Sequence, residues 1–330
     1  MFWFAMLLLF LQSTVKLTPG AESATNRTKP SVVRAGSVTS PASSPPRYGQ
    51  VATTQALANR LLALEWGEQT RLTIAPTMHL VETEHFLVFS AWNTLHDPAL
   101  AKVCEEMYSL LRRQFNLAVT EPVWIGKCPI YIFWEPAHFL RFTAEVDRVS
   151  RSNSRASHAD GYHATRSAFA HIVINGVRDF GSSQTEATRR FYEVLVHEGT
   201  HAFLNRYISG GSIAPWVEEG LADFIAATLV PMSEASRKHI EGARDGLRRP
   251  NLAARLFGKT ELTSTDYGIA QSLVRYLIQT NAKAFIRFVG SMKKGATETD
   301  ALAEAFGWSP GQLLKKWGAF AKRALGGDAP

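Results

Sequence analysis

The segment from His197 to His201, with the sequence HEGTH, combines two histidines and a glutamate at a spacing that suits metal chemistry. Residues four apart lie one turn apart on the same face of a helix, so the two imidazoles can hold one metal ion. Glu198, beside the first histidine, can then face a water molecule on that metal. Glu219 offers a third ligand from a second helix. Three protein ligands and one open position are the arrangement of a catalytic zinc site.

The residues around the two histidines favour a buried helix. Apolar side chains flank the motif on both sides: Phe191, Val194, Leu195, Ala202, Phe203 and Leu204. Histidines in such surroundings are destabilising unless a partner satisfies them. The alternative is an amphipathic helix with two surface histidines. Asp223 supports the metal site, because it follows Glu219 by one helical turn and adds a carboxylate on the same face.

Together the two segments resemble the gluzincin branch of the HExxH metallopeptidases, which includes thermolysin-like and aminopeptidase-like enzymes. The resemblance rests on the HEGTH motif with Glu219 as a later ligand, on the string Trp216-x-x-Glu219-Gly220-x-Ala222, and on Glu219-x-x-x-Asp223. It covers roughly residues 185–230. The metzincin pattern does not fit, because its further Gly and His fall at Leu204 and Tyr207.

The resemblance implies a role for each of these residues. His197, His201 and Glu219 would hold one zinc ion per chain, and Glu198 would act as the general base that activates water. Asp223 would orient His197 and raise its basicity. We therefore expect an exported zinc metallopeptidase that hydrolyses a peptide or protein. The alternative is a non-catalytic zinc-bearing domain that binds a protein or a component of the cell envelope.

Tyr267 is the candidate donor for the oxyanion of the tetrahedral intermediate. The string Tyr267-Gly268-x-Ala270 is similar to the catalytic-tyrosine segment of the aminopeptidase relatives, although the lysine of that segment is absent. The alternative is a tyrosine packed beside the start of a helix. The Gly-x-Met-Glu-Asn string that holds a free amine in the aminopeptidases is also absent, so the choice between endopeptidase and exopeptidase stays open.

Net charge and the N-terminus bear on partners and location. The net charge is +7, but the basic pairs are scattered and lack interleaved aromatic residues, so we expect no nucleic-acid site. Residues 1–23, with an apolar run from Phe2 to Leu11, read as a signal peptide or an uncleaved signal anchor. The Pro- and Ser-rich residues 24–48 are typical of a disordered linker. The catalytic part would then be exported, as a periplasmic, extracellular or membrane-tethered domain.

Residues 49–330 read as one α+β domain of zincin-like plan. We expect a small N-terminal mixed sheet and the active-site helix in the sheet-containing part at 49–206, and a C-terminal helical subdomain at 207–330. We expect strands at 85–89, 129–134 and 169–175, and helices at 50–66, 98–115, from about 185 through the HEGTH motif, from Pro215, and from 267 onward. Ser182 or Ser183 would cap the motif helix. The Ser-, Arg- and His-rich residues 148–166 read as a loop. By the resemblance, the strand at 169–174 would be the edge strand that pairs with substrate.

Other residues carry open alternatives. Cys104 and Cys128 either form a disulfide or are buried free thiols. His158, His163 and His171 either line the cleft, where one of them would be a further oxyanion donor, or are surface and edge residues. Gly199 lowers the stability of the motif helix by roughly 1 kcal/mol relative to alanine, and we expect it where a neighbouring element packs closely. The sequence does not define an oligomeric state.

Overall fold

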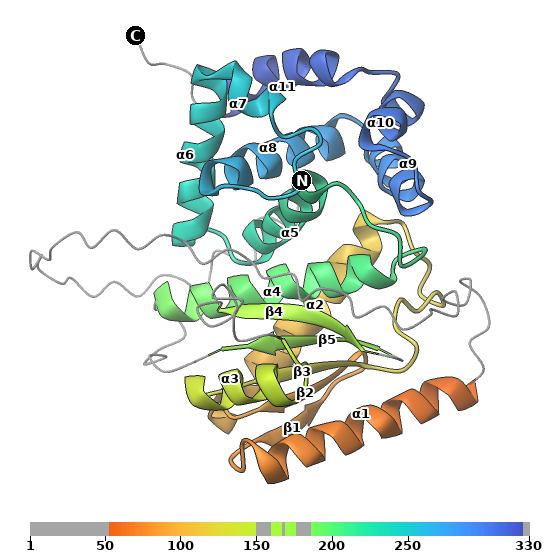
Figure 1. Ribbon diagram of the computed structural model, residues 1–330, viewed down its shortest axis with the longest axis vertical. Coiled ribbons are helices and arrows are strands. Elements are labelled where there is room, and N and C mark those ends of the chain that lie inside the picture. The colour runs from red at the N-terminus through yellow and green to blue at the C-terminus, as the bar shows by residue number, and fades with distance from the viewer. Residues whose placement is uncertain (1–52, 150–159, 167–168, 176–185, 326–330) are drawn as a thin grey trace, which may run out of the picture.

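The computed structural model describes residues 53–149, 160–166, 169–175 and 186–325. Figure 1 shows a small sheet covered by helices, with a larger group of helices beside it. The strands are β1 (His79–Glu82), β2 (Phe86–Ser90), β3 (Cys128–Ile132), β4 (Gly161–Arg166) and β5 (Phe169–Ile174). The helices are α1 (Thr53–Thr73), η2 (Thr94–His96), α2 (Asp97–Gln114), α3 (Pro136–Glu145), α4 (Glu186–Arg206), α5 (Pro215–Leu229), α6 (Glu234–Arg248), α7 (Pro250–Ala254), α8 (Ser264–Thr280), α9 (Ala282–Lys293), α10 (Glu298–Phe306) and α11 (Pro310–Ala324).

The strands form one mixed sheet in the order β1-β2-β3-β5-β4. The central strands β2, β3 and β5 are parallel, and β1 and β4 add antiparallel at the two edges. The predictions of an α+β fold and of a small mixed sheet are therefore confirmed. Buried parallel strands read as continuous apolar runs, which is why β2, β3 and β5 could be recognised in the sequence.

The central strands send alternate side chains into two buried layers. Val88 and Ile130 belong to the core shared with α2 and α4, whereas Leu87 and Tyr131 belong to the core shared with α1 and α3. This alternation follows from the two-residue period of a strand. The sheet is thus sandwiched between two layers of helices, and α4 lies on the face shared with α2 (Figure 1).

Helices α5 to α11 lie on the side of α4 opposite the sheet (Figure 1). Local signals set several of their first residues: Pro215 occupies the first turn of α5, and Ser233 caps α6 through a hydrogen bond from the Ser236 amide. Thr263 and Asp266 form a capping box at the start of α8. Helix α8 packs against both α5 and α6, so the elements around α5 form one continuous core.

Two expectations about the sheet are wrong. Residues 161–166 form strand β4 and not a loop, and β4 takes the edge position that we expected for Phe169–Ile174. Strand β5 lies inside the sheet, between β3 and β4. The sequence of β4, Gly-Tyr-His-Ala-Thr-Arg, lacks the continuous apolar run of the central parallel strands, because polar residues such as His163 and Thr165 alternate with the apolar Tyr162 and Ala164. The first helix also extends beyond the predicted Trp66, to Thr73.

Cys104 and Cys128 are buried free thiols, so the disulfide alternative is wrong for this structure. Burial raises the pKa of both thiols. The predicted signal segment 1–23, the linker 24–48, the caps Ser182 and Ser183, and His158 lie outside the described residues. Within the described ranges, none of the helices combines the length and apolar character that a membrane span needs.

Candidate metal centre

Helix α4 carries His197, Glu198 and His201 into the interior, where their residues are 7%, 2% and 1% exposed. Gly199 lies between them where α2 crosses close by. A Cβ atom on Gly199 would be 2.2 Å from the sulfur of Met107, so a larger residue would require Met107 to move. The expected close packing at Gly199 is therefore confirmed.

Helix α5 brings Glu219 against the two histidines. Glu219 Oε2 lies 3.2 Å from His197 Nε2 and 3.4 Å from His201 Nε2, and the two Nε2 atoms are 3.1 Å apart. Trp216, which is fully buried, anchors the first turn of α5 and donates a hydrogen bond from Nε1 to Glu298 on α10. The three predicted ligands, from two helices, therefore converge on one point.

The outer nitrogen of each histidine faces a carboxylate. Asp223 Oδ1 lies 2.9 Å from His197 Nδ1, and Glu218 Oε1 lies 3.4 Å from His201 Nδ1. A carboxylate accepts hydrogen bonds, so the contact with Asp223 favours a proton on His197 Nδ1. Glu218 lies at ion-pair distance from His201 Nδ1 and favours the same tautomer there. With the protons on Nδ1, both Nε2 atoms would present lone pairs toward Glu219. The predicted role of Asp223 beside His197 agrees with this contact.

In this tautomeric state the two Nε2 atoms and Glu219 Oε2 all present lone pairs to one another, and none of the three atoms carries a hydrogen. Glu219 Oε2 is buried and has no hydrogen-bond partner there. A tetrahedral metal with bonds of about 2.0–2.1 Å separates its ligand atoms by roughly 3.3 Å, which matches the observed triangle of 3.1, 3.2 and 3.4 Å. The residues fit a metal ion held by two imidazoles and one carboxylate.

The electrostatics also favour a cation. Burial lowers the pKa of His197, but the hydrogen bond to Asp223 and the nearby Glu219 carboxylate outweigh it, so the net shift is upward. Burial raises the pKa of Glu219, whereas His201 and His197 lower it, so the net shift is downward. The carboxylates are therefore ionised, and the imidazoles take up protons when no metal supplies the positive charge. Metal binding would displace these protons.

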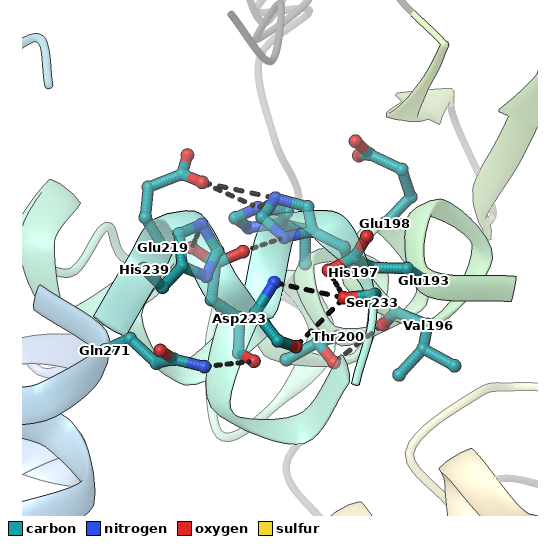
Figure 2. A network of polar contacts seen from close by, with 12 residues as sticks. Glu193, Val196, His197, Glu198, Thr200, Glu219, Asp223, Ser233, His239 and Gln271 are labelled. Atoms are coloured by element: carbon teal, nitrogen blue, oxygen red, sulfur yellow. Dashed lines mark hydrogen bonds and ion pairs between the residues drawn. The ribbon is translucent and has the colours of Figure 1, made fainter. Parts of the chain in front are cut away.

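A second layer of contacts holds Asp223 in place, as Figure 2 shows. His239 on α6 places Nε2 3.2 Å from Asp223 Oδ2, and Gln271 on α8 donates to the backbone carbonyl of Asp223 at 3.0 Å. His239 is 2% exposed. Our sequence reasoning missed His239 and Glu218. The position of Glu218 next to Glu219 was a usable signal, whereas nothing local to His239 indicates its contact.

Glu198, the expected general base, lies beside His163 from strand β4. His163 Nδ1 is 3.4 Å from Glu198 Oε2, and the His163 ring stacks on the His201 ring with centroids 5.0 Å apart. Burial raises the pKa of Glu198, but the hydrogen bond from His163 and the nearby imidazoles of His197 and His201 outweigh it, so the net shift is downward. His163 is buried beside Glu198, so its interpretation as a surface residue is wrong, while a role in a cleft or as an oxyanion donor stays a prediction.

His171 and Tyr267, two further candidates from the sequence, differ in their placement. His171 Nε2 contacts Asp147 at 2.9 Å, and the Asp147 carboxylate also accepts a hydrogen bond from Tyr162. His171 belongs to this separate buried network and not to the site. Tyr267 lies in the first turn of α8, half-buried, one turn before Gln271. This position is on the side of α8 that reaches Asp223.

A second group of residues, Glu84, His85 and Glu105, also lies close enough to hold a metal ion. His85 Nδ1 is 2.6 Å from Glu105 Oε2, and the side chain of Glu84 is 81% exposed. The Glu105 carboxylate already accepts a hydrogen bond from the His85 amide and contacts His85 Nδ1. The group on α4 and α5 is therefore the stronger candidate.

Searches against protein-family models and against curated proteins find no match to this chain. The chemistry of the site is therefore inferred from its own geometry.

Proposed function

We propose that this chain is an exported zinc-dependent peptidase with a zincin-like catalytic domain. One observation carries the proposal: one side-chain atom each of His197, His201 and Glu219 converge at metal-ligand spacing, and the buried Glu198 is adjacent to His197 in the sequence. The apolar run near the N-terminus supports export.

The donor set supports zinc over other common metals. Two imidazoles and one carboxylate suit zinc, whereas Mg²⁺ and Ca²⁺ prefer sites made of oxygen ligands. When bound, zinc supplies a Lewis acid and lowers the pKa of a coordinated water to about 7. Three protein ligands leave a position for that water, which a structural site would close with a fourth residue.

Glu198 is the proposed general base. Its carboxylate is ionised, buried and one residue from His197, so it can accept a proton from a water molecule at the site. The protonated Glu198 can then donate to the leaving amine of a cleaved peptide bond. Asp223 and Glu218 keep the two imidazoles oriented during these steps.

An extended peptide is the proposed substrate. Strand β4 is the sheet edge nearest α4, and in the described part of the chain it pairs with β5 alone. Its outer edge can therefore accept a peptide backbone as an added strand. Because β4 carries His163 to Glu198, a peptide bound there would pass beside the proposed general base.

The first experiment measures zinc and hydrolysis for the wild type, Glu198→Gln and His201→Ala. We expect about one zinc per chain and cleavage of a peptide library by the wild type. Glu198→Gln should keep zinc and lower kcat by about 10²–10⁴-fold, because it removes the proton acceptor alone. His201→Ala should lose both. Exposed Glu106→Gln is the matched control for the charge change. Full zinc without hydrolysis in the wild type would favour the binding domain, and full activity in Glu198→Gln would refute the mechanism.

Tyr267 is the proposed oxyanion donor. Tyr267→Phe removes only the hydroxyl group, so kcat should fall by about 10²-fold while KM and zinc content stay unchanged. Tyr276→Phe on the same helix is the control, because Tyr276 packs against Trp308 and Phe320, away from α5. Equal kcat values for Tyr267→Phe and wild type would show that Tyr267 has a packing role.

A further inference from the structure

Strand β4 lies along α4 in a fixed register. Gly161, near Val194, allows close approach, because a Cβ atom there would be 2.8 Å from the Val194 side chain. Four residues later, Thr165 donates a hydrogen bond to Asn205 Oδ1 at 3.0 Å. His163 lies between these two contacts and on the same face of the strand. The strand therefore places the His163 imidazole at the turn of α4 that contains the motif.

The environment of His163 is unusual for a residue that only fills space. It is 7% exposed, and a buried imidazole is destabilising without a polar partner. The partner is Glu198, whose Oε2 lies 3.4 Å from His163 Nδ1. Nδ1 donates to Glu198 in the tautomer of His163 that carries its proton on Nδ1, which is the tautomer that this contact favours. An apolar side chain at this position would also cover α4, and it would leave no buried polar atom in need of a hydrogen-bond partner.

The second contact of His163 restricts its ring. The ring stacks on His201 at an interplanar angle of 19°, with centroids 5.0 Å apart. His201 is in turn held by Glu218 and faces Glu219. The donor that faces Glu198 is therefore aligned with a residue of the candidate metal centre, and rotation of the His163 ring would break the stack.

A cation at the site would attract Glu198 as well as Glu219. Figure 2 shows the two carboxylates on opposite sides of His197, with Glu219 alone turned toward the ligand nitrogens. A hydrogen bond from a residue outside the ligand set would hold the Glu198 carboxylate in place against this attraction. Strand β4 supplies such a donor.

We propose that His163 is the positioning residue of Glu198: its Nδ1–H holds the carboxylate beside the metal ligands and out of the ligand set. The inference rests on the proposed function and deepens it. A carboxylate that becomes a metal ligand would no longer be free to accept a proton from water, so the loss of this hydrogen bond should lower kcat without lowering metal content.

Two substitutions separate positioning from packing. His163→Phe keeps a ring and removes the donor, and kcat should fall about 100-fold, the effect of misplacing a catalytic group by about 1 Å. KM and zinc content should stay at wild-type values. His163→Asn replaces Nδ1 with an amide nitrogen, so its kcat should be at least tenfold higher than that of His163→Phe. His96→Phe is the matched control, because it makes the same substitution at a histidine that stacks on Trp92, outside the candidate site; its kcat should stay within about twofold of wild type.

Crystal structures of the zinc-loaded variants give a readout that does not depend on activity. Glu198 should leave its wild-type position and approach the metal in His163→Phe, and should return in His163→Asn. An unchanged Glu198 in His163→Phe, a wild-type kcat, or loss of zinc would each overturn the inference. If the wild type hydrolyses no peptide, the proposed function fails, while the position of Glu198 in the crystals still decides the role of His163.

Discussion

Glu218 and Asp223 give each metal-facing histidine its own carboxylate. The two contacts differ in length, 2.9 Å for Asp223 and 3.4 Å for Glu218. Partners of this kind fix the tautomer and the orientation of a ligand, and their loss typically lowers metal affinity 10–100-fold. Both carboxylates come from α5, the helix that also supplies Glu219, so one helix sets the geometry of the whole ligand set.

We expect Asp223→Asn and Glu218→Gln each to weaken zinc binding, Asp223→Asn by about 100-fold and Glu218→Gln by about 10-fold. The order follows from the shorter Asp223 contact. Competition with a chromophoric chelator measures both affinities, and Glu241→Gln on the exposed face of α6 is the control. An unchanged affinity in Glu218→Gln would remove Glu218 from the metal centre.

Glu105 gives a prediction for stability at low pH. Burial raises the pKa of Glu105, but hydrogen bonds from His85 and Thr83 outweigh it and lower the pKa to about 2. A carboxyl group with a depressed folded-state pKa stabilises the fold above its unfolded value, near 4.5, and this contribution is lost as the pH falls toward 2.

Urea unfolding at several pH values tests the pH-dependent contribution of Glu105 to the free energy of unfolding. At pH 7, Glu105→Gln should lower the free energy of unfolding by about 1 kcal/mol, a figure reduced for solvent screening of a partly exposed pair. The difference from wild type should shrink as the pH falls from about 4.5 to 2.5. Glu106→Gln, next to it and exposed, should change stability by less than about 0.5 kcal/mol at every pH. A pH-independent difference would contradict the assignment.

At the scale of elements, helix packing around α5 depends on close backbone approach. A Cβ atom on Gly220 would be 2.5 Å from the carbonyl oxygen of Ala270, which belongs to the backbone of α8. A backbone atom has less freedom to move than the end of a flexible side chain. A larger residue at Gly220 would therefore shift α5 and, with it, the adjacent Glu219.

We expect Gly220→Ala to lower the free energy of unfolding by about 2 kcal/mol, in spite of the higher helix propensity of alanine. Zinc affinity should fall in the same variant because Glu219 moves. Gly318→Ala in α11 is the matched control, since no neighbouring atom lies within 4 Å of its Cβ position and the substitution should be neutral or stabilising. Thermal and urea unfolding would show the contrast, and equal stability of the two variants would refute the packing argument.

The way the site residues are divided among helices and strands explains which parts of the site could be predicted from the sequence. His197, Glu198 and His201 share one helix, and Glu219 and Asp223 share another, so the 3.6-residue period alone places each set on one face. The contact of His239 with Asp223 depends on how α6 docks on α5, which no local pattern encodes. The position of β4 was missed for a related reason: its register along α4 is set by contacts with distant residues such as Asn205.

At the scale of the whole molecule, the candidate metal centre lies where the sheet-covering helix α4 meets the helices that follow it. The ligands come from α4 and α5, and Asp223 is tied to α6 and α8 through His239 and Gln271. A bound metal therefore cross-links two groups of helices that otherwise meet through packing. Any ligand that binds only the folded state adds its binding free energy to stability.

Metal removal should therefore lower the melting temperature. At a free zinc concentration about 1,000 times the Kd, the stabilisation is about 4 kcal/mol, which corresponds to a fall of roughly 10 °C on chelation for a chain of this size. Scanning calorimetry with and without EDTA measures the shift. His201→Ala should melt at the same temperature in both conditions, and a wild type insensitive to EDTA would contradict a structural contribution from the metal.

Strand β4 has a consequence for self-association. A sheet edge offers backbone groups to any chain that arrives in extended form, whether that chain is a peptide or a second molecule of the same protein. Here the edge strand carries His163, which contacts Glu198, so a chain that added to this edge would lie next to the strand that reaches the candidate metal centre. A second copy of the protein and a peptide substrate would then compete for the same edge. A high protein concentration would therefore inhibit the proposed activity competitively.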